Sequence, residues 1–130
     1  MADRAPTAAD DSAAHGRAPD RATALRRPDL LRRAAAESFA TFALVVAGCG
    51  AIVCDRHSGG GLGVVGVGLV FGLVIMVMVY ATGHLSGAHI NPAVTLAFTV
   101  TRHFPAREAL AYIGGQLAGA VAGASLLLAV

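Results

Sequence analysis

Lysine is absent from the 130-residue chain, and charged residues of every kind are scarce. Asp, Glu, Lys and Arg together make up 14% of the residues, compared with roughly a quarter in a typical soluble domain. None of them occurs from Ser58 to Thr101 or from Ala109 to Val130. A water-soluble fold covers its core with charged surface, and a chain of this length is too short to enclose long apolar helices within itself. Lipid is therefore the expected solvent for most of the chain.

Cysteine is scarce as well. Cys49 and Cys54 lie five residues apart in an apolar run. They provide neither a disulfide framework nor a four-ligand zinc site by themselves, so we expect buried thiols that act as small hydrophobic groups. Residues 1–29 also lack the apolar stretch of a secretory signal, and we expect none there.

The ten arginines are unevenly distributed, since seven of them precede Ala34. They lie in a segment rich in Ala, Asp and Pro, whereas a nucleic-acid-binding face combines basic and aromatic residues on a folded surface. Segments of this composition are typically disordered. We therefore expect residues 1–33 to form a disordered cytoplasmic tail, and we expect no nucleic acid as a partner.

Three apolar segments follow this tail, at residues 34–54, 62–82 and 108–130. Each approaches or exceeds the ~20 residues that a helix needs to cross a bilayer core. Four arginines closely precede the first segment, one lies in the loop after it, and two precede the third. Because basic residues favour the cytoplasmic side, we predict three transmembrane helices with the N-terminus in the cytoplasm.

Small residues recur at four-residue spacing in the last two segments, at Gly68 and Gly72 and at Gly115, Gly119 and Gly123. In membranes such series let helices approach closely. They favour a tight bundle and indicate no particular substrate.

The linker at residues 83–101 is uncharged and about half apolar. Asn91 and Pro92 are typical of a helix N-terminus, as the N-cap and the first helical residue. A helix from Pro92 to about Thr101 would be ~15 Å long, half the thickness of a bilayer core. Irregular backbone at membrane depth is tolerated only inside protein or along a water-filled cavity, so we predict a re-entrant half-helix beside a pore. The alternative, a helix lying on the membrane surface, needs basic residues on its polar face, and this segment has none.

Within this linker the chain reads His84-Leu-Ser-Gly-Ala-His-Ile-Asn-Pro-Ala-Val-Thr95. The run resembles, almost letter for letter, the first signature loop of the aquaporin (major intrinsic protein) family. The likeness extends from about Ala34 to the C-terminus through Ala36-Glu37-Ser38-Phe39, Gly48-Cys49-Gly50, Phe71-Gly72, and Tyr112, Gln116, Gly119 and Ala120. The strings Gly48 to Ala51 and Val77 to Tyr80 look most like the nodulin-like branch, some of whose members pass glycerol or neutral metalloid acids besides water.

The family fold consists of two inverted repeats, each with three spanning helices and one half-helix. The resemblance therefore implies an all-α membrane protein in which residues 34–130 form one aquaporin-like repeat, with the re-entrant loop and half-helix at 83–101. The second signature loop and the arginine that follows it are not among the 130 residues. We expect a truncated N-terminal half of a channel, with the missing second repeat as its partner and a homotetramer as the assembly of the complete protein.

The resemblance also assigns roles at the turn. The signature residues Asn91, Pro92 and Ala93 would place the Asn91 carboxamide at the pore, where it donates a hydrogen bond to a passing solute. The positive end of the helix dipole would repel cations at that point. A purely structural role for Asn91, as an N-cap, is the alternative.

Further pore residues follow from the same resemblance. The backbone carbonyls of Gly87, Ala88 and His89 would form a ladder of acceptors that leads to Asn91. Phe71 matches the aromatic position of the family's narrow outer filter, where phenylalanine resembles water-selective members. Ordinary packing against lipid or protein is the alternative for Phe71.

Glu37 is the only carboxylate within the first segment. A charge well inside lipid costs ~3 kcal/mol on insertion scales, so we expect Glu37 to face the bundle. By resemblance its side chain accepts hydrogen bonds from the re-entrant backbone and holds Gly87 to Asn91 in place. Snorkelling to the interface near Arg33 is the alternative.

Metal binding and catalysis find little support. His84 and His89 have no Cys or carboxylate at ligand spacing, so we expect neither a metal ion nor a cofactor. We expect the His89 ring to line the pore instead. No nucleophile accompanies these residues, so we expect no enzyme. We predict a passive channel of the plasma membrane for water or small neutral solutes, with lipid and solute as partners. The alternative is a non-conducting membrane module that needs a separate second half or another partner.

Overall fold

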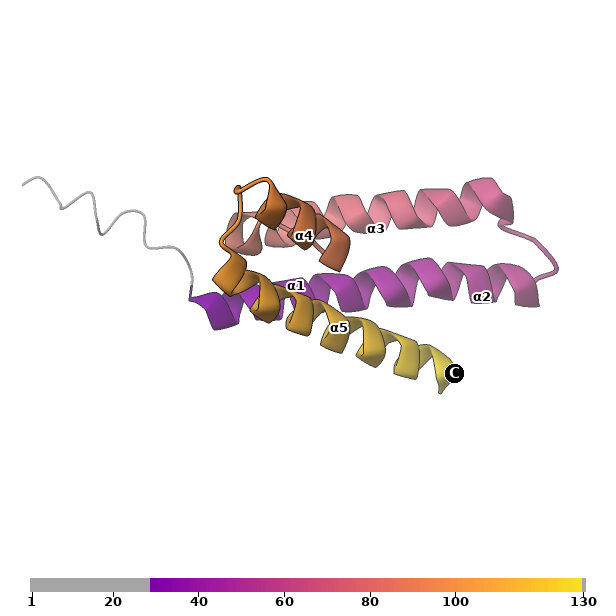
Figure 1. The fold of residues 1–130 in the computed structure, drawn as a ribbon. Helices are drawn as coiled ribbons and strands as arrows, with labels where there is room; N and C mark the ends of the chain where they lie inside the picture. Colours follow the sequence, from indigo (N-terminus) through magenta and orange to yellow (C-terminus); the bar gives the residue numbers. More distant parts are fainter. Residues whose placement is uncertain (1–28, 130) are drawn as a thin grey trace, which may run out of the picture.

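The computed structural model describes residues 29–129, and every regular element in that range is a helix. Three helices there are long and apolar enough to cross a membrane: Leu30–His57, Gly63–Ser86 and Ala106–Leu128. Figure 1 shows the first of them lying between the other two, with a shorter helix at one end of the bundle. The expected all-α fold with three candidate spans is confirmed. The part of the predicted tail at residues 1–28 lies outside the described residues.

The first span is one continuous helix made of three parts. Helix α1 (Leu30–Leu44) is followed by a π-helical turn, η1 (Val45–Cys49), and by α2 (Gly50–His57). Its 28 residues form a rod about 42 Å long at a rise of about 1.5 Å per residue. The helix therefore extends beyond the predicted segment 34–54 at both ends.

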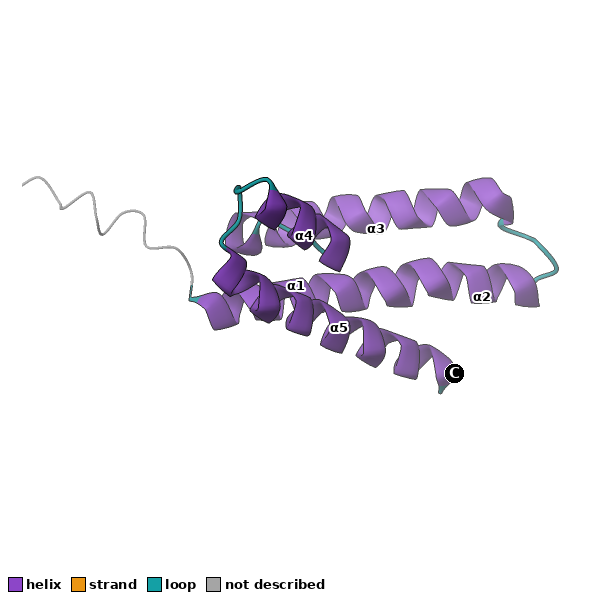
Figure 2. Ribbon diagram, viewed as in Figure 1, coloured by secondary structure: helices purple, strands orange, loops and turns teal. Residues whose placement is uncertain are grey.

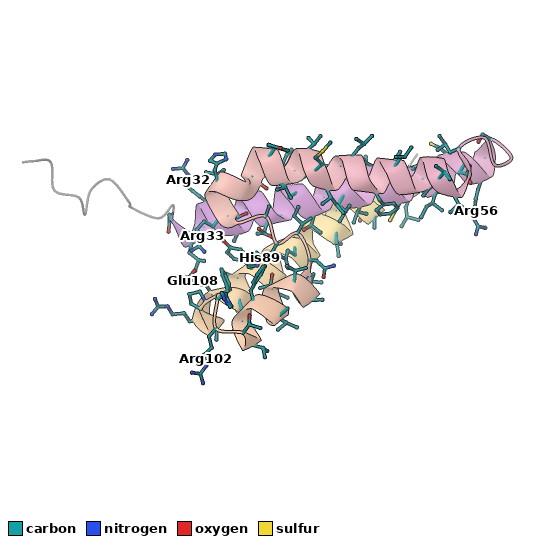
Figure 3. The ribbon with its side chains drawn as sticks, turned by 90° about the horizontal axis from the view of Figure 1, so that it is seen from above. Arg32, Arg33, Arg56, His89, Arg102 and Glu108 are labelled. Carbon is teal, nitrogen blue, oxygen red and sulfur yellow. The ribbon has the colours of Figure 1, made fainter. Side chains whose placement is uncertain are left out.

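Residues 30–33, which we assigned to the tail, belong to this helix, so the tail prediction was wrong there. The reason is that Arg33 points into the bundle, where it is only 7% exposed. Its guanidinium donates to Glu108 Oε2 at 2.6 Å and to the Tyr112 hydroxyl at 3.0 Å. Figure 3 shows Arg33 beside Glu108, while Arg56 lies at the far end of the molecule. Because these partners bind the Arg33 guanidinium inside the bundle, Arg33 belongs to the helix and not to the tail.

The remaining helices begin and end within a few residues of the predicted limits. They are α3 (Gly63–Ser86), α4 (Pro92–Val100) and α5 (Ala106–Leu128). Helix α3 continues beyond the predicted end at Thr82 and stops only before Gly87, where φ is +91°. Glycine adopts this left-handed conformation without the penalty that a side chain brings, and it commonly ends helices.

Glycines allow α5 to lie directly on the backbone of α1. A Cβ atom at Gly115 would lie 2.6 Å from the Ala34 carbonyl oxygen, and one at Gly119 would overlap the Ser38 carbonyl group. Gly123 repeats the contact one turn further along, against Phe42. Helix α5 therefore makes the close approach to α1 that the spacing of its glycines predicts. Gly68 and Gly72 on α3, by contrast, have nothing within 4 Å among the described residues.

The segment between α3 and α5 enters the bundle and returns to the end that it left. The Thr41 hydroxyl donates to the Ile90 carbonyl at 3.2 Å, whereas Phe104, further along the chain, lies under the Arg33 guanidinium at 5.8 Å. Thr41 is eight residues beyond Arg33 on α1, about 12 Å along the helix axis. Figure 2 shows the same path, because α4 starts part-way along the bundle and runs back toward the end of α3. The chain thus has the shape of the predicted re-entrant segment.

The contact between α5 and α1 is tested by adding one methyl group. Gly119→Ala is expected to lower the free energy of unfolding by about 1–3 kcal/mol, because overpacking against backbone cannot be relieved by a rotamer change. Gly114→Ala is the matched control on the same helix, since a Cβ there meets nothing within 4 Å. Unfolding titrations in mixed micelles give both values. Equal stability of the two variants would contradict this packing.

Candidate functional site

The Glu37 carboxylate is the centre of a buried polar network. The residue is 0% exposed, and both of its oxygens are fully used. Oε1 accepts from the Ser86 hydroxyl at 2.6 Å and from the His89 backbone N–H at 2.9 Å. Oε2 accepts from the Ile90 N–H at 2.6 Å and from Gln116 Nε2 at 2.8 Å. Glu37 therefore faces the bundle and does not snorkel to an interface.

These bonds hold a backbone that is unfavourable by itself. Ala88 and Ile90 have φ values of +49° and +56°, and a β-branched residue in this region is a genuine outlier. Each such residue costs of order 1–3 kcal/mol and persists only where its surroundings impose it. Here Glu37 takes two successive N–H groups, and Thr41 donates to the Ile90 carbonyl. The carboxylate and the hydroxyl together fix the shape of the turn.

A second layer of the network connects Glu37 to helix α4. The Gln116 amide group donates both to Glu37 and to the Thr95 hydroxyl, the latter at 3.0 Å. Thr95 in turn donates to the Asn91 carbonyl at 3.2 Å, and both Thr95 and Gln116 are 0% exposed. The first turn of α4 is thereby fixed to the same carboxylate as the loop before it.

A third layer closes the end of the bundle at which the loop enters. Arg33 contacts Glu108 and Tyr112, as described above, and the Tyr112 hydroxyl donates to the Ser86 carbonyl at 2.7 Å. The Arg33–Glu108 pair is largely buried, with side-chain exposures of 9% and 16%. These bonds join α1, α5 and the last residue of α3, so the entry to the loop has fixed walls.

The two polar atoms of the Asn91 carboxamide differ in whether they are hydrogen-bonded to the described protein. Its Oδ1 accepts from the Ala93 N–H at 2.8 Å, which makes it the N-cap of α4, with Pro92 as the first helical residue. The Nδ2 group makes no hydrogen bond within residues 29–129, and both Asn91 and Ala93 are exposed. The cap thus orients a free donor at the positive end of a helix. The N-cap role and the donor role are compatible.

The carbonyls of Gly87, Ala88 and His89 accept no hydrogen bond within the described part of the chain. They precede Asn91 along the turn, as a line of acceptors requires. The His89 ring, which we expected to line the pore, is half buried. It packs among Phe98, Phe104 and Tyr112, with ring centroids 4.8–5.2 Å away. Its Nδ1 lies 3.1 Å from the Thr95 hydroxyl, so aromatic contacts and this hydrogen bond keep the ring inside the bundle.

Phe71 lies apart from this network, on α3. Its half-buried ring rests on Gly48, where a Cβ atom would come within 2.5 Å of ring atom Cζ. The structure brings Phe71 against the first span and not against Asn91.

Sequence reasoning gave no role to Thr95, Gln116, Tyr112 or the inward-turned Arg33. A signal was present for two of them, because Gln116 is the only glutamine of the chain and, like Tyr112, lies in an apolar, uncharged span. A polar side chain in such a place has to find a partner inside the bundle. No group of three or more His, Cys, Asp or Glu residues arranged for a metal ion occurs in residues 29–129.

The chain is similar to a known protein family and to several known proteins. The family described as Major intrinsic protein matches residues 24–130. Aquaporin NIP1-1 of Oryza sativa subsp. japonica is 48% identical over 97 residues, which cover 75% of this chain and 34% of that protein. Aquaporin Z of Bradyrhizobium diazoefficiens is 45% identical over 98 residues, or 75% of this chain and 41% of that protein. The chain thus spans between a third and two fifths of the length of these relatives.

The central role of Glu37 is tested by Glu37→Gln. The amide keeps one acceptor oxygen, so two of the four donors lose their partner, at about 1–3 kcal/mol for each buried donor. We expect lower stability and faster hydrogen exchange at the His89 and Ile90 amides, measured by NMR in micelles.

Asp55→Asn is the matched control for this change. Asp55 Oδ1 accepts from two backbone N–H groups, those of Leu62 and Gly63, in a partly exposed loop. The asparagine keeps that oxygen, so a much smaller loss is expected. If the two variants were equally stable, Glu37 would not be the residue that holds the turn.

Proposed function

Because the chain belongs to the major intrinsic protein family, we propose that it forms one repeat of a passive transmembrane channel for water or small neutral solutes. The observation that carries this proposal is the free Nδ2 donor of Asn91. It lies at the positive end of α4, next to the unpaired carbonyls of Gly87, Ala88 and His89. A donor beside a line of acceptors provides hydrogen bonds for a neutral polar molecule that has lost its water shell.

The same geometry disfavours cations. The N-terminus of a helix carries roughly half a positive charge. Within residues 29–129 the carboxylate that contacts the turn is that of Glu37, whose oxygens already accept four hydrogen bonds. The part of the chain that the structure describes therefore leaves no anionic group free to compensate a cation at Asn91. Passage of water, glycerol or a neutral metalloid acid fits this electrostatic environment.

We further propose a plasma-membrane location with the N-terminus in the cytoplasm. Arg32, Arg33 and Arg102 lie at one end of the bundle, and Arg56 lies at the other (Figure 3). Basic residues favour the cytoplasmic side, so the loop would enter from the cytoplasm. A second repeat, absent from these 130 residues, would close the other side of the pore, and the complete protein would assemble as a homotetramer.

The role of the Asn91 donor is tested by Asn91→Asp in vesicles that contain the complete gene product. Aspartate keeps the oxygen that caps α4, so the fold is retained, while the donor becomes an acceptor with negative charge. Water flux, measured by stopped-flow light scattering, is expected to fall ~10-fold, as the loss of about 1.4 kcal/mol at the barrier predicts. A cation leak should appear at the same time. Unchanged flux and unchanged ion exclusion would refute the role of Asn91.

Flux measurements on the unmodified (parent) protein distinguish a channel from a non-conducting module. Vesicles that contain it should pass water faster than empty vesicles, with no reactant consumed. Sequencing of the transcript beyond the Val130 codon is the second observation, and a further Asn-Pro-Ala loop followed by arginine supports the channel. An immediate stop codon together with an absence of flux would favour the module.

A further inference from the structure

The π-helical turn η1 is the one irregular stretch in the first span. It extends over Val45–Cys49 between two regular α-helical parts. Single π-turns inside α-helices are rare and occur frequently at functional sites. Gly48 is the only buried residue of this turn, so the irregular stretch buries a position without a side chain.

Two helices contact this turn from different sides. On one side a Cβ atom at Gly123 of α5 would lie 3.1 Å from the Val45 Cβ. On the other side the Phe71 ring of α3 occupies the space that a Gly48 side chain would need: Cζ and Cδ1 lie 2.5 Å and 2.7 Å from the Cβ position. The absence of a side chain at Gly48 is therefore what determines how close the ring can come to α1.

The contact between Gly48 and Phe71 lies further along the first span than the re-entrant turn does. Gly48 lies seven residues beyond Thr41, which contacts the re-entrant turn at Ile90. Seven residues correspond to about 10 Å along the helix. The Phe71 ring thus lies about 10 Å beyond the turn that carries Asn91, further from the end at which the chain enters. Among the described residues the Phe71 side chain is only half buried.

We propose that Gly48 is a positioning residue that determines solute selectivity by seating the Phe71 ring against α1. This inference rests on the proposed channel function, and it goes further by naming the contact that sets the free width beside Phe71. A side chain at position 48 would displace the ring away from α1. A larger solute would then be excluded more strongly than water, because pore diameter limits what passes.

The test compares Gly48→Ala with Gly50→Ala in vesicles that contain the complete gene product. A Cβ at Gly50 meets only the flexible end of Leu127, at an ordinary distance of 3.4 Å, so Gly50→Ala serves as the control. For Gly48→Ala we expect the glycerol-to-water permeability ratio to fall ~10-fold, the change that about 1.4 kcal/mol at the barrier produces. For Gly50→Ala we expect the same glycerol-to-water permeability ratio as in the unmodified (parent) protein.

A double variant isolates the ring as the cause. In a Phe71→Ala background there is no ring to displace, so adding Gly48→Ala should leave the ratio of that background unchanged. Fluorine NMR of fluorophenylalanine-labelled protein gives the ring position without any flux, and the Phe71 resonance should shift in Gly48→Ala only. If Gly48→Ala folds poorly, restored folding in the double variant supports the same contact.

The outcomes separate this inference from the proposed function. Parent water flux with an unchanged or increased ratio in Gly48→Ala contradicts the role of Gly48 and leaves the channel intact. The role of Gly48 is also contradicted if Gly48→Ala changes the glycerol-to-water permeability ratio equally in the parent protein and in the Phe71→Ala background. No water flux in the parent protein contradicts both the channel and the inference that depends on it.

Discussion

A carboxylate sealed among apolar helices imposes the constraint on which this structure depends. An anion in such a place is tolerated only if hydrogen-bond donors replace the water that it has lost. The donors to Glu37 come from the end of α3, from the re-entrant backbone and from α5. Satisfying one charge therefore assembles three segments that are far apart in the sequence, and it fixes the turn that carries Asn91.

The close approach of α5 to α1 is the geometric condition for this network. Gly115 and Gly119 allow the two backbones to touch, and Gln116, between them, then reaches both Glu37 and Thr95. The polar groups of the turn divide into two sets as a result. The N–H groups of His89 and Ile90 and the Ile90 carbonyl are bound to protein, whereas the carbonyls of Gly87, Ala88 and His89 and the Asn91 Nδ2 group make no hydrogen bond within residues 29–129. These are the groups that the proposed path uses, and within the described residues Gln116 Oε1 is a further buried side-chain atom without a hydrogen-bond partner.

Much of this arrangement could be predicted from the sequence, because its signals are local. Long apolar runs give the spans, Asn91-Pro92 gives the start of the half-helix, and the cost of an isolated charge turns Glu37 inward. Features that depend on distant partners could not be predicted in this way. Arg33 reads as part of a basic tail until Glu108, 75 residues later, is found beside it. The π-turn has no local sequence signature either. Its contact partner, Phe71, lies on another helix, so the contact with Gly48 could not be predicted from the neighbouring residues.

Depth measurements on spin-labelled protein test the central claim most directly. In a background without the two native cysteines, labels are placed by His84→Cys, Ala93→Cys and His103→Cys, all at exposed positions, and their collision rates with oxygen and with a water-soluble nickel chelate are compared in bilayers. The account predicts positions 84 and 103 near the same membrane surface and position 93 well below it. Position 93 at the depth of the other two, or positions 84 and 103 on opposite surfaces, would contradict a turn held inside the bundle by Glu37.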